Sequence, residues 1–285
     1  MRPIHTLASI GDTRGVIWEI NAGTPIDLKD NYNRTALWHA AHEGWARTVK
    51  SLIRQGANIK ATDRMGRTAL HAAAVYGGRA TIQQLVDAGI PVDVRDRKNE
   101  MTPLFFAVNI ANKPGVKALL SMGADPNAAS DTGSTPIHTW VISARHNGVT
   151  KKNNSILELL IRHGGNINAR DRSGDTPLHK ALRILGYDNP WETKNQMMII
   201  QELLRMGSNI YIKNMYGQSA VDLAPTNQSR DVLLWSNKNY RNTVNKALSK
   251  LPDNMIREIM TKVDPGSIRH EYTRRGLKRK QDKGY

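Results

Sequence analysis

Residues 66–78 read Gly66-Arg67-Thr68-Ala69-Leu70-His71-Ala72-Ala73-Ala74-Val75-Tyr76-Gly77-Gly78. A turn glycine comes first, followed by a threonine that can cap a helix, an alanine-rich segment and a glycine stop. The Thr-x-Leu/Ile phrase recurs at Thr35, Thr102, Thr135 and Thr176, at intervals of 33 to 41 residues. One such unit cannot bury its own apolar face, so this period predicts a stack of similar units.

Each unit also contains a second apolar segment. After Thr68 it includes Ile82, Leu85 and Val86, whose i, i+3, i+4 spacing predicts an apolar stripe on a second helix. Glycines that tolerate a left-handed cap are expected to end these second helices. They are Gly56, Gly89, Gly123, Gly164 and Gly207.

The phrase Thr-Pro-Leu-His, complete at residues 176–179, resembles the core of the ankyrin repeat. The resemblance implies an all-α ankyrin-repeat solenoid of about seven repeats with short β-hairpin fingers. In units five and six, 7 and 10 extra residues separate the two helices, and we expect them to form loops. The expected divisions are an array over 1–235, with regular units at 30–128, units with inserts at 129–213 and a terminal unit at 214–235.

The composition excludes several classes of site. There is no cysteine, which removes disulfides, thiolate metal sites and cysteine nucleophiles. No segment has 18 consecutive apolar residues, and residues 1–15 contain no signal-like apolar run, so we expect no membrane partner. No P-loop, dinucleotide fingerprint or hydrolase motif occurs. We therefore expect no enzymatic activity, catalytic residue, cofactor or metal.

Four histidines occupy the histidine position of the repeated phrase, namely His5, His71, His138 and His179. The resemblance implies that these side chains are structural and bond to neighbouring loops. No carboxylate or second histidine accompanies them at the spacing of metal ligands.

The phrase also indicates where a partner would bind. The residue after the motif histidine, and those three and four positions later, are expected on the concave side of the array. Tyr76, Phe106 and Ile110 would form an exposed apolar strip there, and aromatic residues are enriched at binding hot spots. The large residues Trp38, Phe105 and Trp140 are interpreted as core instead. The expected target-binding residues are His39, His42, Tyr76, Phe106, Ile110 and Arg183.

A second pattern lies at residues 251–268. A Leu-Pro pair precedes apolar residues on one helical face, and an Asp-Pro pair ends the helix. This stretch resembles the first half of an F-box, the module that docks on the Skp adaptor of cullin–RING ubiquitin ligases. The resemblance implies that the adaptor-binding residues are Leu251, Pro252, Met255, Ile256, Ile259, Met260, Val263, Pro265 and Ile268.

Two features of this C-terminal segment bear on its interpretation. The usual second and third F-box helices are missing, and the arrangement looks like the PRANC-type effectors of viruses and intracellular bacteria. Residues 236–268 are thus expected to form a linker helix and a helical F-box-like segment. The alternative is an amphipathic helix that only caps the last repeat.

The last sixty residues carry half of the net charge of +16, with 14 Lys and Arg against 6 Asp and Glu. A basic tail over 269–285 could support nuclear import or phosphate contact, or simply be a solvated end. Its clustered cations are Arg274, Arg275, Lys278, Arg279 and Lys280.

These features favour a monomeric, protein-binding adaptor in the cytoplasm or nucleus. As a substrate receptor it would hold a target protein on the repeats and recruit the Skp adaptor; a pathogen effector would do so in the host cell. One alternative is a non-enzymatic scaffold or inhibitor that sequesters its target. Another is a nuclear or nucleic-acid-associated protein acting through the tail, although nucleic acid is not the partner we expect.

Overall fold

The computed structural model describes residues 3–183, 190–224, 230 and 233. The chain separates into two units, Met1–Leu233 and Leu234–Tyr285, and the second lies outside the described residues. In the first unit, the described residues form twelve helices and no β-strand. The predicted all-α class is therefore confirmed for this part of the chain.

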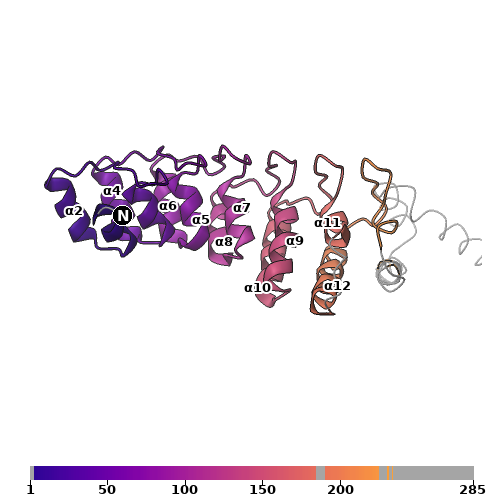
Figure 1. Ribbon diagram of the computed structural model, residues 1–285. Coiled ribbons are helices and arrows are strands. Elements are labelled where there is room, and N and C mark those ends of the chain that lie inside the picture. Colours follow the sequence, from indigo (N-terminus) through magenta and orange to yellow (C-terminus); the bar gives the residue numbers. More distant parts are fainter. Residues whose placement is uncertain (1–2, 184–189, 225–229, 231–232, 234–285) are drawn as a thin grey trace, which may run out of the picture. The chain divides into compact units, whose positions relative to one another are not determined.

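The helices come in pairs, a first helix and a second helix in each unit, and the pairs follow one another in chain order (Figure 1). The first helices are α1 (Pro3–Ser9), α3 (Ala36–His42), α5 (Ala69–Tyr76), α7 (Pro103–Asn109), α9 (Pro136–Asn147) and α11 (Pro177–Arg183). The second helices are α2 (Thr13–Asn21), α4 (Ala46–Arg54), α6 (Arg79–Asp87), α8 (Lys113–Ser121), α10 (Lys151–Arg162) and α12 (Pro190–Arg205).

The first helices begin where the repeated threonine can cap them. In α5, the Thr68 side chain accepts a backbone hydrogen bond, and the Thr68 N–H donates to His71 Nδ1 at 3.1 Å. This is a capping box in which histidine replaces the usual glutamate. In α7 the histidine position holds Phe105, and the buried Thr102 hydroxyl has no hydrogen-bond partner. The repeated phrase therefore marks the start of a first helix. Unit four keeps its threonine but has lost the histidine of the capping box.

The core lies between the two layers of helices. Each first helix packs on its neighbours, as α3 does on α1 and α5, and the second helices do the same. Alanines on α5 are buried, which lets adjacent helices approach closely. The stripe predicted on α6 is confirmed, because Ile82 and Leu85 are fully buried and Val86 packs against the same core.

The loops between units, which we call fingers, are tight turns rather than the β-hairpins predicted. In finger three (residues 63–67), Asp63 Oδ1 accepts from the N–H groups of Met65 and Arg67. Neighbouring fingers share single backbone bonds, such as Arg64 N–H to Tyr32 O and Arg97 N–H to Met65 O, each 3.0 Å. Because strands need a ladder of such bonds, one bond per finger leaves no sheet.

The extra residues of unit five lengthen its helices instead of forming a loop, so that prediction is wrong. Helices α9 and α10 have 12 residues each, whereas α7 has 7 and α8 has 9. The Thr150 hydroxyl caps α10 by accepting from Asn153 N–H at 3.2 Å. In unit six, α12 has 16 residues, and residues 184–189 lie outside the described part.

Unit six is tied to the end of the longer α9. The Asn195 side-chain amide of α12 donates to Ala144 O and Arg145 O, each at 3.0 Å. Its carbonyl oxygen accepts from Val149 N–H at 2.9 Å. A seventh finger (residues 214–218) follows, and residues 220–223 form a turn where a seventh first helix was expected.

A prediction concerns the contact between fingers. Gly66 adopts φ +78°, and a Cβ there would lie 2.7 Å from the Arg97 backbone nitrogen. Gly164 has a similar φ of +90° with nothing within 4 Å of the added Cβ. Both Gly→Ala substitutions incur the left-handed strain of about 1 kcal/mol. Only Gly66→Ala also forces finger four away, so it should cost about 1–2 kcal/mol more in urea denaturation. Equal losses at the two glycines would show that the finger contact contributes nothing.

Candidate interaction surface

The motif histidines link each first helix to the next finger. His71 Nε2 lies 3.1 Å from Met101 O, His138 Nε2 lies 3.0 Å from Asp175 O, and His179 Nε2 lies 3.0 Å from Gln218 O. His5 Nε2 reaches Leu28 O at 2.8 Å. All four rings are buried. The structural role implied by the resemblance is therefore what the geometry shows.

The hydrogen bonds of His71 fix its protonation state. Its Nδ1 accepts from Thr68 N–H and so carries no proton, and its Nε2–H donates to Met101 O. Burial lowers the pKa of His71 to about 4, although the Met101 carbonyl and nearby carboxylates act in the opposite direction. Burial lowers the pKa of His138 as well. These rings are neutral parts of the scaffold and present no reactive group.

Exposed large side chains occur at the C-terminal ends of the short first helices and midway along the longer α9. Tyr76 is 66% exposed, Ile10 61% and Ile142 48%, which is unusual for large apolar residues. His42 and Tyr76 are in direct contact, with ring centroids 5.1 Å apart in an edge-to-face arrangement. The helix-end strip is our name for six side chains that lie four or five residues after the motif-histidine position on first helices that pack in succession. Its members are Ile10, His42, Tyr76, Ile110, Ile142 and Arg183.

Beside this strip, fingers two and three (residues 30–34 and 63–67) hold arginines against aromatic rings. The Arg34 guanidinium lies 4.6 Å from the Tyr32 ring centroid and 4.9 Å from that of Trp38. Arg34 Nε also bonds Asp30 Oδ2 at 2.9 Å. Ring contact and a salt bridge together restrict the guanidinium to one orientation, which lowers the entropy that a partner's carboxylate must remove.

The carboxylate that holds Arg34 is itself set into the base of the finger. Burial alone would raise the pKa of Asp30, but the N–H groups of Arg34 and Tyr32, the His39 ring and the Arg34 charge lower it to about 2. In unit three the pattern repeats, since Arg67 pairs with the buried Asp63. These carboxylates point inward, whereas the arginines extend along the surface.

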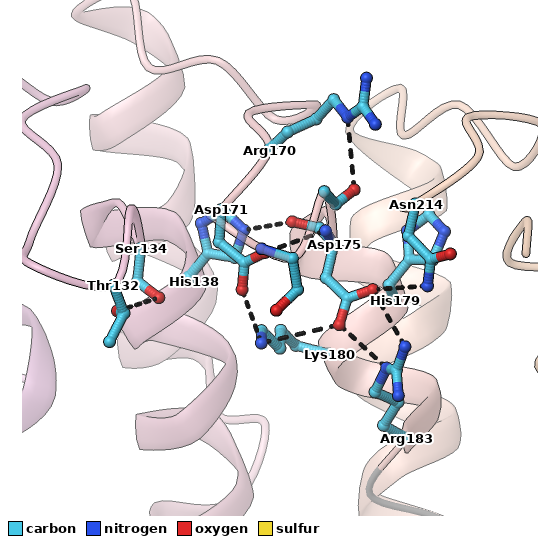
Figure 2. Close-up of polar contacts among 12 residues, drawn as sticks. Thr132, Ser134, His138, Arg170, Asp171, Asp175, His179, Lys180, Arg183 and Asn214 are labelled. Atoms are coloured by element: carbon cyan, nitrogen blue, oxygen red, sulfur yellow. Dashed lines mark hydrogen bonds and ion pairs between the residues drawn. The ribbon is translucent and has the colours of Figure 1, made fainter. Parts of the chain in front are cut away.

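Unit six replaces this pattern with a network that balances its own charges (Figure 2). Asp175 stands where Arg34 and Arg67 stand in the earlier units, and its carboxylate bonds Arg183 Nε at 2.9 Å and Asn214 Nδ2 at 2.8 Å. Lys180 Nζ lies 2.6 Å from Asp171 Oδ2. Two carboxylates thus face two cations, so these four charges balance one another.

A shallow polar pocket of about 440 Å³ lies between fingers five (residues 130–134) and six (residues 171–175). It is lined by Asp131, Thr132, Ser134, Asp171, Arg172, Ser173 and Lys180. No apolar side chain contributes to the lining, so the pocket would suit a hydrogen-bonding group and not an apolar anchor.

The predicted target-binding residues fall into three groups. Tyr76 is exposed as expected, whereas Phe106 and Ile110 are half-buried, with Phe106 against the edge of the His71 ring at 5.4 Å. His39 corrects the prediction: it is only 5% exposed, because it bonds Asp30 Oδ2 at 3.0 Å inside its own finger. His42 is half-buried and Arg183 is exposed but held by Asp175. Trp38, Phe105 and Trp140 are buried, as interpreted from the sequence.

Sequence reasoning missed two apolar members of the strip and the arginines. Ile10 follows His5 by the same spacing that separates Tyr76 from His71, and Ile142 follows His138 by four positions. The repeat register therefore contained this signal. No sequence signal revealed Arg34 on two rings, because the contact joins a finger to a helix.

The structure bears on the remaining expectations only within its described part. There, no cluster of three His, Cys, Asp or Glu side chains could hold a metal. Among these helices none is long and apolar enough to cross a membrane. The F-box-like residues 251–268 and the basic tail lie outside the described residues.

Comparison with known sequences gives one family match. The family described as "Ankyrin repeats (3 copies)" matches residues 4–96 and 104–189. An ankyrin repeat protein of Acanthamoeba polyphaga mimivirus is 37% identical over 86 residues, covering 30% of this chain and 10% of that protein. Vaccinia virus ankyrin repeat protein B18 is 33% identical over 115 residues, covering 37% of this chain and 19% of that protein. The matched segments thus span a fifth or less of these relatives.

Solved structures show the same fold over a longer segment. The ankyrin repeat domain of Bcl-3, described as a member of the IkappaB protein family, has a TM-score of 0.63 at 26% identity, covering 82% of this chain and 98% of that domain. The human ASB11 ankyrin repeat domain has a TM-score of 0.64 at 22% identity, covering 83% and 98%. The second likeness concerns the fold alone.

Proposed function

Because the chain belongs to the ankyrin-repeat family, we propose that it is a non-catalytic adaptor that binds a partner protein on its fingers and first helices. The observation that carries this proposal is the helix-end strip. Three of its large apolar members, Ile10, Tyr76 and Ile142, stay exposed although the adjacent core is closely packed, and monomeric proteins rarely leave such residues in a row without a partner.

The composition of the surface supports the same proposal. Tyr76 supplies an exposed aromatic ring to the strip, and Arg34 connects to that ring through Trp38 and His42. Aromatic residues and arginine are the types that dominate binding energy at protein interfaces. The motif histidines are used in the scaffold, and the hydroxyl groups beside them, such as that of Thr176 at 2.8 Å from His179 Nδ1, are buried at the helix starts.

We expect Tyr76→Ala combined with Ile142→Ala to weaken partner capture by about tenfold or more, as loss of interface anchors does. Both side chains are largely exposed, so the free energy of unfolding should change by about 0.5 kcal/mol or less. The measurement is affinity capture from cell lysate with the full chain, followed by quantitative mass spectrometry. Trp18→Ala is the matched control, because Trp18 is 67% exposed but lies on the second helix α2.

Two outcomes would contradict this assignment. Proteins that still bind the double variant but no longer bind the Trp18→Ala variant would place the binding site on the second helices. A double variant that unfolds much more easily than the wild type would show that the strip belongs to the core.

We further propose that residues 251–268 recruit the Skp adaptor of a cullin–RING ligase, so that the partner becomes a ubiquitination target. The support is the sequence pattern, in which Leu251-Pro252 opens an apolar helical face and Asp264-Pro265 ends it. The similarity to viral ankyrin proteins supports an effector that works in the cytoplasm or nucleus of a host cell. A scaffold or inhibitor that sequesters its target is the alternative.

The adaptor proposal is tested with purified Skp adaptor at micromolar concentration and moderate salt. The triple substitution Leu251→Ala, Pro252→Ala and Ile259→Ala should abolish capture while shifting the melting temperature by a few degrees at most. The control variant carries alanine at Lys278, Arg279 and Lys280 and should bind normally. If the wild-type chain captures no adaptor, the ligase role is rejected, and the scaffold or inhibitor remains as the function.

A further inference from the structure

We propose that the partner segment bound by units two to four is acidic, and that it places its carboxylates on a row of four arginines. This arginine row consists of Arg34, Arg64, Arg67 and Arg97. The inference rests on the proposed function and adds the chemical class of the partner.

The row follows from the repeat itself. Arg64 and Arg97 occupy equivalent positions at the tips of successive fingers, and the backbone N–H of each bonds the preceding finger at 3.0 Å. Both side chains are exposed. Arg64 contacts the same ring as Arg34, with its guanidinium 5.9 Å from the Tyr32 centroid. Two guanidinium groups therefore lie near a single ring.

Arg34 and Arg67 are each paired with a buried carboxylate, so the excess positive charge of the row comes from Arg64 and Arg97. Arg67 pairs with Asp63 and lies 6.0 Å from the Phe106 ring centroid. Asp63 is buried at the base of finger three and accepts backbone N–H groups there. Ordered guanidinium groups bind carboxylates well because little side-chain entropy remains to be lost.

The row also has defined ends. At the next fingertip the equivalent residue is Asp131, and in unit six the charges of Asp171 and Asp175 are matched by Lys180 and Arg183. Glu100 is the exposed carboxylate within finger four (residues 96–101). The adjacent fingertip arginines thus end at Asp131, and finger five separates them from the exposed fingertip residue of unit six, Arg172.

A protein segment fits this surface better than a nucleic acid. The row connects to the helix-end strip through rings in contact: Arg34 lies over Trp38, Trp38 stacks on His42, and His42 contacts Tyr76. An acidic segment can cover this apolar surface with apolar side chains between its carboxylates. A phosphate backbone would satisfy the arginines and leave that apolar surface exposed to water. Complementary charge would mainly set specificity and the rate of association, with the strip supplying the anchor.

The test is selection of a random twelve-residue peptide library, displayed on phage, against the full chain. Peptides selected by the wild type should contain at least about twofold more Asp and Glu than the unselected library, because charge complementarity sets specificity. Arg64→Glu with Arg97→Glu should remove this enrichment and favour Lys and Arg instead. The matched control is Arg47→Glu with Arg79→Glu, which makes the same charge change on the second helices α4 and α6.

The remaining outcomes separate this inference from the proposed function. Selected peptides that depend on Tyr76 but show no acidic excess would overturn the acidic partner and leave the binding surface standing. Peptides whose recovery is unaffected by Tyr76→Ala would count against both. Retention of single-stranded polyuridine through Arg64 and Arg97, without selection of acidic peptides, would assign the row to nucleic acid and overturn the inference. Selection that enriches no peptide would overturn it as well.

Discussion

Trp140→Ala should lower the free energy of unfolding by about 3–5 kcal/mol, the usual loss when a large aromatic side chain is removed from a core. Trp140 is 1% exposed and stands on α9 where the repeat elsewhere has alanine. Its indole Nε1–H donates to Asn153 O at 2.8 Å, which joins α9 to α10 within unit five. The cavity would open where two lengthened helices meet.

Urea denaturation followed by circular dichroism measures this loss. Trp140→Phe is the control, because it keeps most of the buried volume and gives up the indole hydrogen bond; we expect about 1–2 kcal/mol. Stability in repeat arrays depends on neighbouring units, so hydrogen exchange should accelerate in α9 and α10 first. A loss below about 1 kcal/mol for Trp140→Ala would show that the side chain is not a core element.

Stability should fall as the pH is lowered from 7 towards 4, in part through the buried histidines His71 and His138, whose pKa values are lowered by burial. His71 has a pKa lowered to about 4 in the folded chain, against about 6.5 when unfolded. The unfolded chain therefore binds more protons in this window, and the stabilisation present above pH 6.5 is lost as the pH falls. For His71 alone the loss is about 3 kcal/mol by pH 4, of which about 2 kcal/mol has gone by pH 5.

The measurement is the unfolding free energy at pH 7.5, 6 and 5 for the wild type and for His71→Gln. The variant should be less stable at pH 7.5, because the bonds to Thr68 and Met101 are altered, but its stability should depend less on pH. The lowered pKa values of Asp30 and Asp171 affect the unfolding free energy only at more acidic pH, so these residues do not cause the pH dependence expected between pH 7.5 and 5. Identical slopes for the two proteins would contradict a neutral, buried His71.

Much of the fold could be predicted because the repeated signals act locally. A threonine cap, an apolar stripe and a glycine with positive φ each specify a helix boundary without reference to distant residues, as Thr68, Leu85 and Gly89 illustrate. Where the prediction was wrong, contacts with distant residues or a competing local structure determined the conformation. Between the two helices of unit five we expected a loop insert, but α9 continues to Asn147, where Asn195 of α12 bonds its last turns, and α10 already begins at Lys151, capped by Thr150.

The interaction surface was less predictable for a related reason. Spacing alone placed Tyr76 correctly, but it also placed His39 on the surface, where Asp30 instead holds it inside finger two. The arginine row depends on packing between fingers and rings of different units, which no single repeat reveals. Ile142 could have been found by extending the register through the lengthened unit.

The central claim is that a partner protein binds the fingers and the ends of the first helices. It is tested most directly by hydrogen–deuterium exchange on the full chain, alone and with the captured partner. The account predicts slower exchange in fingers two to four (residues 30–34, 63–67 and 96–101) and at the C-terminal ends of α3, α5, α7 and α9, with α2, α4 and α6 unchanged. Protection confined to α2, α4 and α6, with the fingers unchanged, would contradict it.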